Sequence, residues 1–346
     1  MSKTLQDYAT LINDTIQSNE INHYITTDNM CQNLGGIDTF KNINIPQGKV
    51  RSFQKDDILL SNIRLYFRKV YRAKQKGGCS SDVLVFRAKH IDSATLFAIL
   101  SSQIFTDYAC SGSQGSKMPR GNKTHMMDFK IPTINFTIAK IFNSIQNKIE
   151  NNHKINELLH TLAYKIYEYY FKYKSKNAKL EQIIIENPKS GIMVKNAQKT
   201  QDKYPFFTSG DNILSYPKAI IDGRNCFLNT GGNAGIKFYV GKASYSTDTW
   251  CICANEFSDY LYLLLSSIKN HINQSFFQGT SLKHLQKNLL KKYPIYMPSA
   301  HEIKKFNQII IPLLTLISIN TRTSKKLEQI RDFLLPLLLK QQVKPK

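Results

Sequence analysis

The chain is poor in acidic side chains. It contains 25 Asp and Glu residues against 47 Lys and Arg residues, which gives a formal net charge of +22. This imbalance indicates a polyanionic partner, of which nucleic acid is the first candidate. The alternatives are an anionic membrane surface, or a composition rich in Lys and Asn that simply reflects an AT-rich genome.

Long apolar runs are also absent. No uninterrupted hydrophobic stretch is long enough to cross a bilayer, and no signal peptide precedes Asp7. We therefore expect a cytoplasmic protein that has no membrane partner.

Cysteine is present, but its metal-binding spacings are missing. The six cysteines form no C-x-x-C pair, and no histidine cluster lies near them in the sequence. Cys251 and Cys253 alternate as residues on one face of a strand do. We predict reduced cysteines, most of them in the core of a cytosolic protein, and no metal site.

Familiar catalytic motifs are missing as well. Gly235 to Ala243 looks like a phosphate-binding loop, but five residues separate its glycines and Ala243 replaces the Ser or Thr that would bind magnesium. No G-x-G-x-x-G motif follows a strand, the Asn/Asp-Pro-Pro-Tyr motif of base methylation does not occur, and the carboxylates are scattered. We therefore predict that the chain is not an enzyme and binds no cofactor itself.

What the sequence does contain is an internal repeat. Gln114-Gly115-Ser116 and Gln278-Gly279-Thr280 each precede a Pro-bounded segment and then a long amphipathic run. The two glycines are separated by the same number of residues as Phe142 and Phe306 in the runs that follow. A repeat this long indicates two copies of one domain-plus-helix unit rather than a solenoid.

Both amphipathic runs are predicted to be long helices. Apolar residues recur at helical spacing from Ile134 to about Tyr173 and from Ile303 to about Lys340. Pro312 is expected to kink the second helix, and Pro336 to loosen its last turns. Because neither helix is stable alone in water, we expect them to pair with each other. The globular segment between them favours an antiparallel pair.

The predicted fold class is therefore α+β with a pseudo-two-fold arrangement. Two globular domains are separated by two long helices that form an antiparallel coiled coil. The predicted bounds are 1–132 for the first domain, 133–178 for the first helix, 179–298 for the second domain and 299–346 for the second helix.

Three segments are candidates for contact with nucleic acid. Residues 209–233 hold Gly-rich turns on either side of a strand, where backbone amides can approach phosphates and Asn side chains can read base edges. The Gln-Gly-Ser/Thr loops at Gln114 and Gln278 occupy the same place in both repeats. In the segment from Arg64 to Lys76, basic and aromatic residues are interleaved. The basic side chains could follow a nucleic-acid backbone while the aromatic rings stack on bases. Ordinary glycine turns and a solvated strand face are the alternatives for the first and last of these.

These segments, in this order, resemble the specificity subunit of type I restriction-modification systems. Tyr204–Asn212 is similar to the beginning of a target recognition domain of that family. Asn229–Thr249 resembles its central glycine turn and the strand that follows, and Gly279–Pro298 resembles its closing segment. The helix from Glu302 to Leu338 is similar to its spacer helix.

The first half departs more from the family pattern. Tyr24–Met30 resembles another version of the domain's beginning, and Gly112–Pro132 resembles the closing segment. Asp56–Asn62 stands where the strand before the glycine turn belongs, but Asn62-Ile63-Arg64 replaces the Gly-rich turn itself. Base contacts in this half therefore do not carry over from the family.

The resemblance implies a non-catalytic reader of double-stranded DNA. Each target recognition domain would lie in a major groove and read one part of a split target, and the paired helices would set the spacing between the parts. Two modification subunits would methylate adenine with S-adenosylmethionine after flipping the base out of the stack. In complexes that also cut, motor-nuclease subunits would join them.

Candidate roles follow from these two lines of argument. The residues expected to read bases are Gln114, Asn212, Asn233 and Gln278. Those expected to contact the DNA backbone are Arg64, Arg68, Lys117, Arg120, Thr230, Gly231, Lys242, Gly279 and Lys283. Those expected to dock the modification subunits are Tyr164, Tyr167, Leu335 and Leu338, with the core between the helices as their alternative role.

Two other functions are compatible with the sequence. One is a basic coiled-coil scaffold that binds nucleic acid without sequence choice. The other is a self-sufficient nuclease or methyltransferase with an unfamiliar site.

Overall fold

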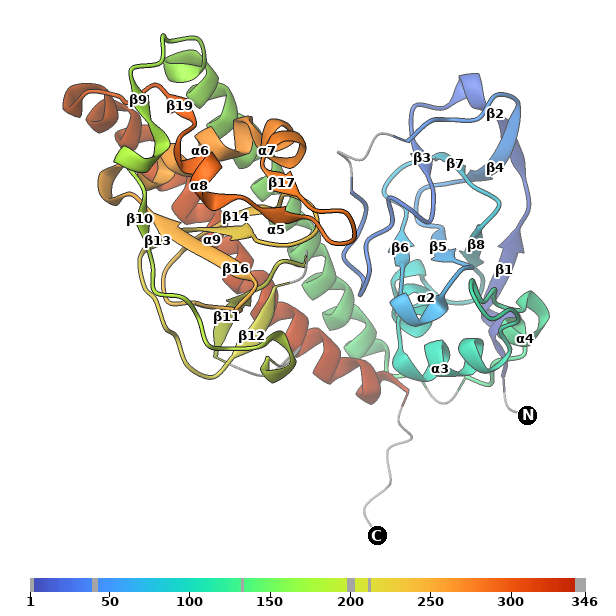
Figure 1. The fold of residues 1–346 in the computed structure, drawn as a ribbon. Helices are drawn as coiled ribbons and strands as arrows, with labels where there is room; N and C mark the ends of the chain where they lie inside the picture. Colours follow the sequence, from blue (N-terminus) through green and yellow to red (C-terminus); the bar gives the residue numbers. More distant parts are fainter. Residues whose placement is uncertain (1–2, 39–42, 132–133, 198–202, 211–212, 340–346) are drawn as a thin grey trace. The chain divides into compact units, whose positions relative to one another are not determined.

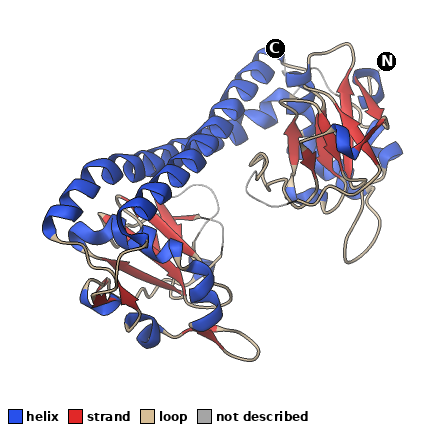
Figure 2. Ribbon diagram, turned by 90° about the horizontal axis from the view of Figure 1, so that it is seen from above, coloured by secondary structure: helices blue, strands red, loops and turns tan. Residues whose placement is uncertain are grey.

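The structure, a computed structural model, describes residues 3–38, 43–131, 134–197, 203–210 and 213–339 (Figures 1 and 2). It divides into two compact units: unit 1 comprises residues 1–151 and 326–346, and unit 2 comprises residues 152–325. The division passes through two long helices, α5 (Phe136–Tyr167) and α9 (Ala300–Leu338), so each unit holds part of both. The domain bounds expected from the sequence assign the helices separately, and they stay a prediction.

Unit 1 is built on two four-stranded sheets. In the first sheet the strand order is β1-β8-β5-β6, and all neighbours are antiparallel. In the second sheet the order is β2-β4-β7-β3, and β3 runs parallel to β7. The strands are β1 (Ala9–Ile12), β2 (Thr15–Gln17), β3 (Tyr24–Ile25), β4 (Lys49–Phe53), β5 (Ile58–Ser61), β6 (Val70–Arg72), β7 (Gly77–Cys79) and β8 (Val83–Ala88).

The side chains of β5 explain how unit 1 is layered. Successive residues of a strand point to opposite faces, and all four residues of β5 are buried. Ile58 and Leu60 belong to the apolar cluster of the neighbouring helices, while Leu59 belongs to the cluster shared with the second sheet. Figure 1 shows α2 and α3 below the strands of this unit. The helices are α1 (Leu5–Tyr8), α2 (Ser93–Leu100), α3 (Gln103–Ser111) and α4 (Lys123–Met127).

Unit 2 repeats the strand order of the first sheet and the parallel pair of the second, which here has three strands. Its main sheet has the order β10-β16-β13-β14 with antiparallel neighbours, and its second sheet has the order β12-β11-β15 with β11 parallel to β15. Two short ribbons, β17-β18 and β19-β9, complete the unit. The strands are β9 (Ala178–Lys179), β10 (Ile185–Glu186), β11 (Tyr204–Phe207), β12 (Leu214–Tyr216), β13 (Arg224–Asn229), β14 (Ile236–Val240), β15 (Ser244–Tyr245), β16 (Thr249–Cys253), β17 (Phe277–Gln278), β18 (His284–Leu285) and β19 (Pro294–Ile295).

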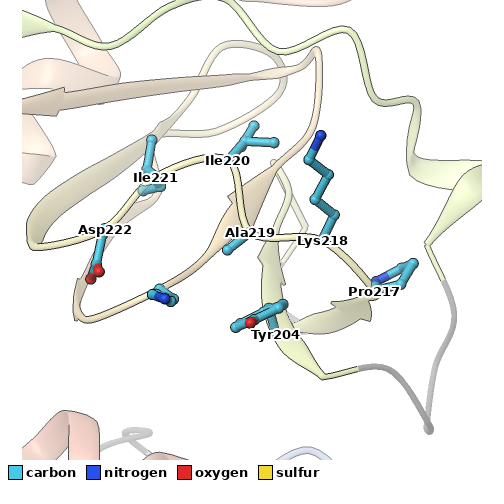
Figure 3. Close-up of a pocket in the computed structure, with 8 residues that line it drawn as sticks. Tyr204, Pro217, Lys218, Ala219, Ile220, Ile221 and Asp222 are labelled. Atoms are coloured by element: carbon cyan, nitrogen blue, oxygen red, sulfur yellow. The ribbon is translucent and has the colours of Figure 1, made fainter.

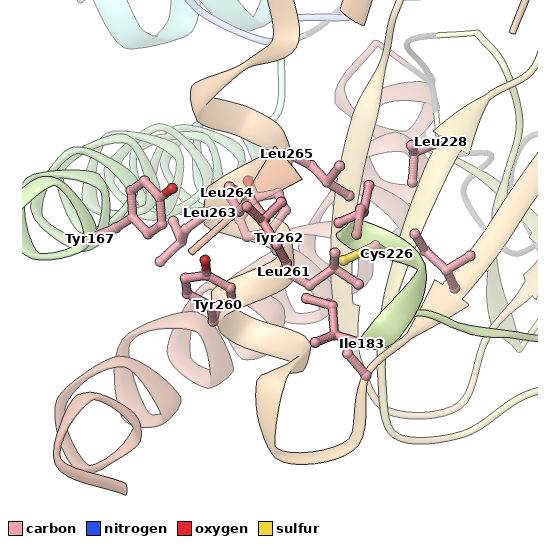
Figure 4. Close-up of a cluster of buried hydrophobic side chains, with 14 of the residues drawn as sticks. Tyr167, Ile183, Cys226, Leu228, Tyr260, Leu261, Tyr262, Leu263, Leu264 and Leu265 are labelled. Atoms are coloured by element: carbon pink, nitrogen blue, oxygen red, sulfur yellow. The ribbon is translucent and has the colours of Figure 1, made fainter. Parts of the chain in front are cut away.

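The largest core of unit 2 lies between β13 and α6 (Ser258–Ser267). Figure 4 shows the side chains of α6 packed together with Cys226 and Leu228 of β13. Phe227 points to the opposite face of the sheet, where its ring stacks on Phe207 with centroids 4.0 Å apart. Each apolar side chain buried in this way contributes about 1.5–3 kcal/mol. The remaining helices of this unit are α7 (Lys269–Ser275) and α8 (Lys287–Lys291).

The two long helices lie close to where the periodicity predicts them. α5 continues into a π-helical turn, Glu168–Lys172, and α9 passes through Pro312 and Pro336 without a break. In unit 2, Asn152 donates to Ser324 Oγ at 3.1 Å, and Asn320 donates to Asn156 Oδ1 at 3.0 Å. Rising residue numbers in α5 therefore meet falling numbers in α9, so the helices run in opposite directions there. The mixed helix and sheet content predicted from the sequence is confirmed.

In unit 1 the same two helices are joined by a buried charge. Arg331 of α9 is 2% exposed, and its Nη1 donates to Gln146 Oε1 of α5 at 3.0 Å. Gln146 in turn donates through Nε2 to the Leu34 carbonyl at 2.8 Å. Arg331 also pairs with Asp332 of the same helix at 3.0 Å, while Gln146 connects Arg331 to the Leu34 carbonyl of the globular part.

We expect Gln146→Ala to destabilise unit 1 by about 3 kcal/mol, because it removes the acceptor of Nη1 of a buried guanidinium and the donor to the Leu34 carbonyl. Chemical unfolding followed by hydrogen exchange in residues 3–131 measures this change. Unit 2 serves as an internal reference, since it contains the single tryptophan, Trp250. Gln103→Ala at an exposed helix position is the matched control and changes stability by less than about 0.5 kcal/mol. Equal effects of the two substitutions would contradict the buried link.

Candidate nucleic-acid interface

Three loops of unit 2 meet at one end of its sheets. They are the loop after β11 (Thr208–Gly210), the turn between β13 and β14 (Thr230–Gly235), and the loop before β16 (Ser246–Asp248). The Thr230 hydroxyl donates to the Asp248 carbonyl at 2.8 Å, and the Thr230 amide donates to Ser209 Oγ at 3.2 Å. Ser209 Oγ also donates to the Asp248 carbonyl. These contacts hold the three loops in one arrangement.

The closing loop of unit 2 joins this group. It runs between β17 and β18, and the Gly232 amide donates to the Lys283 carbonyl at 2.9 Å. The Leu285 amide donates to the Thr230 carbonyl at 3.0 Å, and Gly231 forms a bridge with His284. The structure therefore brings together the two kinds of loop that the sequence singles out in this half. The predicted residues gathered here are Thr230, Gly231, Asn233, Gln278, Gly279 and Lys283, and the side chains of Asn233, Gln278 and Lys283 are exposed.

Asn229 supports the glycine turn from inside. Its Nδ2 donates to the Asn233 carbonyl at 3.1 Å, and its own amide donates to the Gly235 carbonyl at 2.9 Å. A Cβ atom on Gly235 would lie 2.3 Å from that Nδ2, so only glycine fits there. The sequence argument named the turn but missed Asn229, because a buried strand residue carries no outward sign of such a role.

Unit 1 has the same meeting of loops without the glycines. The Arg64 amide, in the loop between β5 and β6, donates to the Pro119 carbonyl of the closing loop at 2.9 Å. Ile63 and Gln114 each form a bridge with Arg120. Gln114, Lys117 and Arg120 are exposed at this junction. Arg120 pairs with Asp82 at 2.9 Å yet stays 61% exposed, so its guanidinium can still reach a phosphate.

Arg68 contacts its own unit. Its Nη2 donates to the Ser101 carbonyl at 2.9 Å, inside unit 1. Burial holds the pKa of the Arg68 guanidinium below its ordinary value. Arg68 therefore anchors the β5–β6 loop to the residues before α3, and the backbone-contact role expected for it stays a prediction. Arg64 is half-buried: its Nε is shielded from solvent, and its Nη2 donates to the Lys117 carbonyl at 3.3 Å.

Lys242 is separated from the other predicted contacts of unit 2. It follows the C-terminal end of β14, whereas the glycine turn precedes the N-terminal end of the same strand. There it lines a surface pocket together with Tyr204, Lys218 and Asp222 (Figure 3). A backbone contact at Lys242 would thus belong to a different part of the unit's surface. Asn212 lies outside the residues that the structure describes.

Most of the residues predicted to dock partner subunits are core residues. Tyr167, Leu335 and Leu338 are 2%, 4% and 0% exposed, because the helices turn their apolar stripes toward their own units. These three side chains lie in the apolar cores of their units, and their docking role stays a prediction. Tyr164 is half-buried. The exposed apolar side chains of α5 in unit 2 are Ile155, Leu158 and Leu162.

Burial shifts the pKa of several cysteine thiols in the described part of the chain. Burial raises the pKa of the Cys79 thiol to about 12 and holds those of Cys226 and Cys251 above their usual range, so these thiols stay protonated and unreactive. Within the described ranges, no group of three or more His, Cys, Asp or Glu side chains is placed to hold a metal ion. Among the helices of this part of the chain, none is both long and apolar enough to span a membrane.

We expect Gly279→Ala to disrupt the closing loop of unit 2. Gly279 has a φ of +140°, and a Cβ there would lie 2.4 Å from the Leu282 carbonyl oxygen. Hydrogen exchange of the Gly232 and Leu285 amides, which depend on this loop, should become at least about tenfold faster, because losing one such contact costs about 1.4 kcal/mol or more of local stability. Gly191→Ala is the matched control, because a Cβ at Gly191 meets nothing within 4 Å. Unchanged exchange in the Gly279 variant would show that the loop tolerates a side chain.

Comparison with known proteins gives a consistent result. Residues 172–329 match the family model of the type I restriction modification DNA specificity domain. The S subunit of a type I restriction-modification system from M. genitalium has a similar structure, with a TM-score of 0.64, 14% sequence identity, and coverage of 99% of this chain and 96% of that one. At this identity the likeness establishes the fold.

A second solved structure is the HsdS subunit from Thermoanaerobacter tengcongensis, which is 13% identical in sequence. The match covers 98% of this chain and 96% of that one, and its TM-score is 0.37. No curated protein sequence matches the chain. The resemblance to specificity subunits that the sequence indicates is confirmed by the family match and by the fold.

Proposed function

We propose that this chain selects the DNA sequence for a type I restriction-modification complex, which is supported by the match of residues 172–329 to the family model of the DNA specificity domain. In this role it is a non-catalytic subunit that reads double-stranded DNA. The observation that carries the proposal is the meeting of the hairpin turn with the closing loop, which gathers Asn233, Gln278 and Lys283 in unit 2. Amide side chains beside a cation and exposed glycines suit base edges flanked by phosphates.

The target is bipartite in this proposal. In each unit a hairpin turn meets the closing loop, and the main sheets of the two units have the same strand order. The exposed side chains of these loops differ between the units. Unit 2 offers Asn233 and Gln278 around a glycine turn, whereas unit 1 offers Gln114, Lys117 and Arg120 around a turn without glycine. Two surfaces of different chemistry are suited to two different half-sites. The helices α5 and α9 would form an antiparallel coiled coil that sets the distance between the two half-sites. That distance would be about one turn of duplex, roughly 34 Å.

Catalysis would come from partners. Two modification subunits would methylate adenine with S-adenosylmethionine, after the base leaves the stack, and motor-nuclease subunits would join complexes that cut. The residues that support a docking surface are Ile155, Leu158 and Leu162, which are 41%, 61% and 49% exposed. Their spacing places them on one face of α5. An exposed apolar stripe of this kind suits the apolar face of a partner helix.

We expect Gln278→Ala to relax base preference at one target position by about 1–3 kcal/mol, because it removes one base-reading amide. Lys283→Ala should instead weaken binding to all sequences and lower the salt slope of binding by about 1. Selection from a random duplex pool, followed by sequencing, measures the first effect, and binding at several salt concentrations measures the second.

Gln308→Ala, at an exposed position of α9, is the control for both substitutions. A wild-type chain that binds random duplex and random RNA equally well would instead identify a scaffold without sequence choice. Modification of DNA by the pure chain, given only metal ion and S-adenosylmethionine, would identify a self-sufficient enzyme.

We expect Leu158→Glu to weaken assembly with the modification subunits by about 2 kcal/mol or more, since it places a charge in the proposed apolar contact. Sedimentation of the reconstituted complex measures this change. Thr323→Glu adds the same charge at an exposed polar position of α9 and should leave assembly intact. Normal assembly of the Leu158 variant would place the docking surface elsewhere.

A further inference from the structure

A lysine in unit 2 ties the loop after β11 to the glycine turn. Lys237, the second residue of β14, donates through Nζ to the Thr208 carbonyl at 2.8 Å and to the Gly210 carbonyl at 2.7 Å. It also reaches Asn229 Oδ1 at 3.3 Å. An ammonium group has three N–H donors, so one lysine can serve all three of these acceptors. Lys237 therefore spans from the loop after β11 to the residue that supports the glycine turn.

The contacts form a short path to a predicted base-reading residue. The Gly210 carbonyl accepts from Lys237, which reaches Asn229 Oδ1, and Asn229 Nδ2 donates to the Asn233 carbonyl at 3.1 Å. Backbone carbonyls outside regular strands need a donor when they are shielded from water. A lysine that supplies this donor fixes both loops at once. The position of the Asn233 backbone then depends on a side chain that itself reads nothing.

Unit 1 contains the corresponding contact. Lys69 donates through Nζ to the Thr27 carbonyl, in the loop after β3. The two loops are equivalent because each follows a strand of the same parallel pair. In unit 1, β3 runs parallel to β7 through Ile25 and Cys79, and in unit 2, β11 runs parallel to β15 through Phe207 and Tyr245. β7 and β15 each precede the last strand of their main sheet, β8 and β16. In unit 2 the lysine lies on the second strand of the β13–β14 hairpin, and in unit 1 it lies just before the second strand of the β5–β6 hairpin. In both units it thus holds the equivalent loop, after β11 or after β3.

The two lysines occupy different positions in their hairpins. Lys237 lies within β14 and pairs with Phe227. Lys69 precedes β6, and its carbonyl accepts from the Ser61 amide at 3.0 Å. An ammonium group reaches the same loop from two different backbone positions, although the turns beside it share no sequence pattern. The recurring feature is the contact itself, which indicates a common requirement to fix this loop.

We propose that Lys237 and Lys69 are positioning residues, each of which sets the geometry of one reading surface and thereby the base choice in one half of the target. This inference rests on the proposed function. Neither lysine contacts a base in this role. Each acts through the loops that it joins, so its loss should change which bases are preferred in its own half and leave the other half as it was.

The experiment uses the full chain assembled with its modification subunits and a random duplex pool, from which methylated or bound sequences are read. Lys237→Met should reduce discrimination at the positions of one half-site by at least about tenfold, the lower range of a lost base contact. Lys69→Met should do the same for the other half-site only. Thermal unfolding, with Trp250 fluorescence for unit 2, confirms that each variant is folded.

Three further variants separate positioning from charge and from folding. Lys189→Met removes a cation from an exposed position of unit 2 outside this network, so it should keep base preference in both halves. Lys237→Arg keeps a cationic donor and should restore discrimination in large part. If Lys237→Met fails to fold, Lys237→Gln takes its place, because glutamine keeps a neutral donor. The base preference of its half-site is then measured in the same way.

Retained preference in both halves for folded Lys237 and Lys69 variants would overturn the proposal, and so would an equal loss in both halves from either one. Both results leave the proposed function standing, because the wild-type complex still selects a sequence. A wild-type complex without any base preference would refute the proposed function and this inference with it.

Discussion

The arrangement of this protein depends on backbone hydrogen bonds between loops that are far apart in the sequence. In unit 2 the Gly232 amide donates to the Lys283 carbonyl, and in unit 1 the Arg64 amide donates to the Pro119 carbonyl. Backbone groups that leave a sheet must find partners or remain in water. Because these loops satisfy each other, their side chains are left to point outward, and a hairpin turn and a closing loop become one surface.

A contact made by the backbone tolerates changes in side chains. Unit 2 forms its turn with Gly231 and Gly232, whereas unit 1 uses Arg64 in a left-handed conformation with a φ of 51°. The strand order of the main sheet persists through this change, and so does the parallel pair of the second sheet. One scaffold can therefore present two surfaces of different chemistry, which is what a reader of an asymmetric target requires.

The apolar residues of the two long helices are divided between buried and exposed positions. The apolar residues of α5 and α9 satisfy their own units first, since a helix is stabilised chiefly by burying its apolar face. Tyr167 and Leu338 therefore lie in the cores, and Arg331 is buried against Gln146. Only the apolar side chains that remain, such as Leu158, are open to a partner. Periodicity alone predicts the helices but not which part of the stripe stays exposed.

The sequence by itself determined the basic charge, the two long helices, the place of the loops and the resemblance to specificity subunits, because composition, periodicity and short motifs are local properties. The role of individual cations was decided only by the tertiary structure. Lys283 stays exposed beside the glycine turn and Lys242 lies at the other end of β14, while Arg68 turns inward to Ser101 and Lys237 holds a loop carbonyl. What a long charged side chain does depends on the acceptors within its reach, and the fold supplies those acceptors from distant parts of the chain.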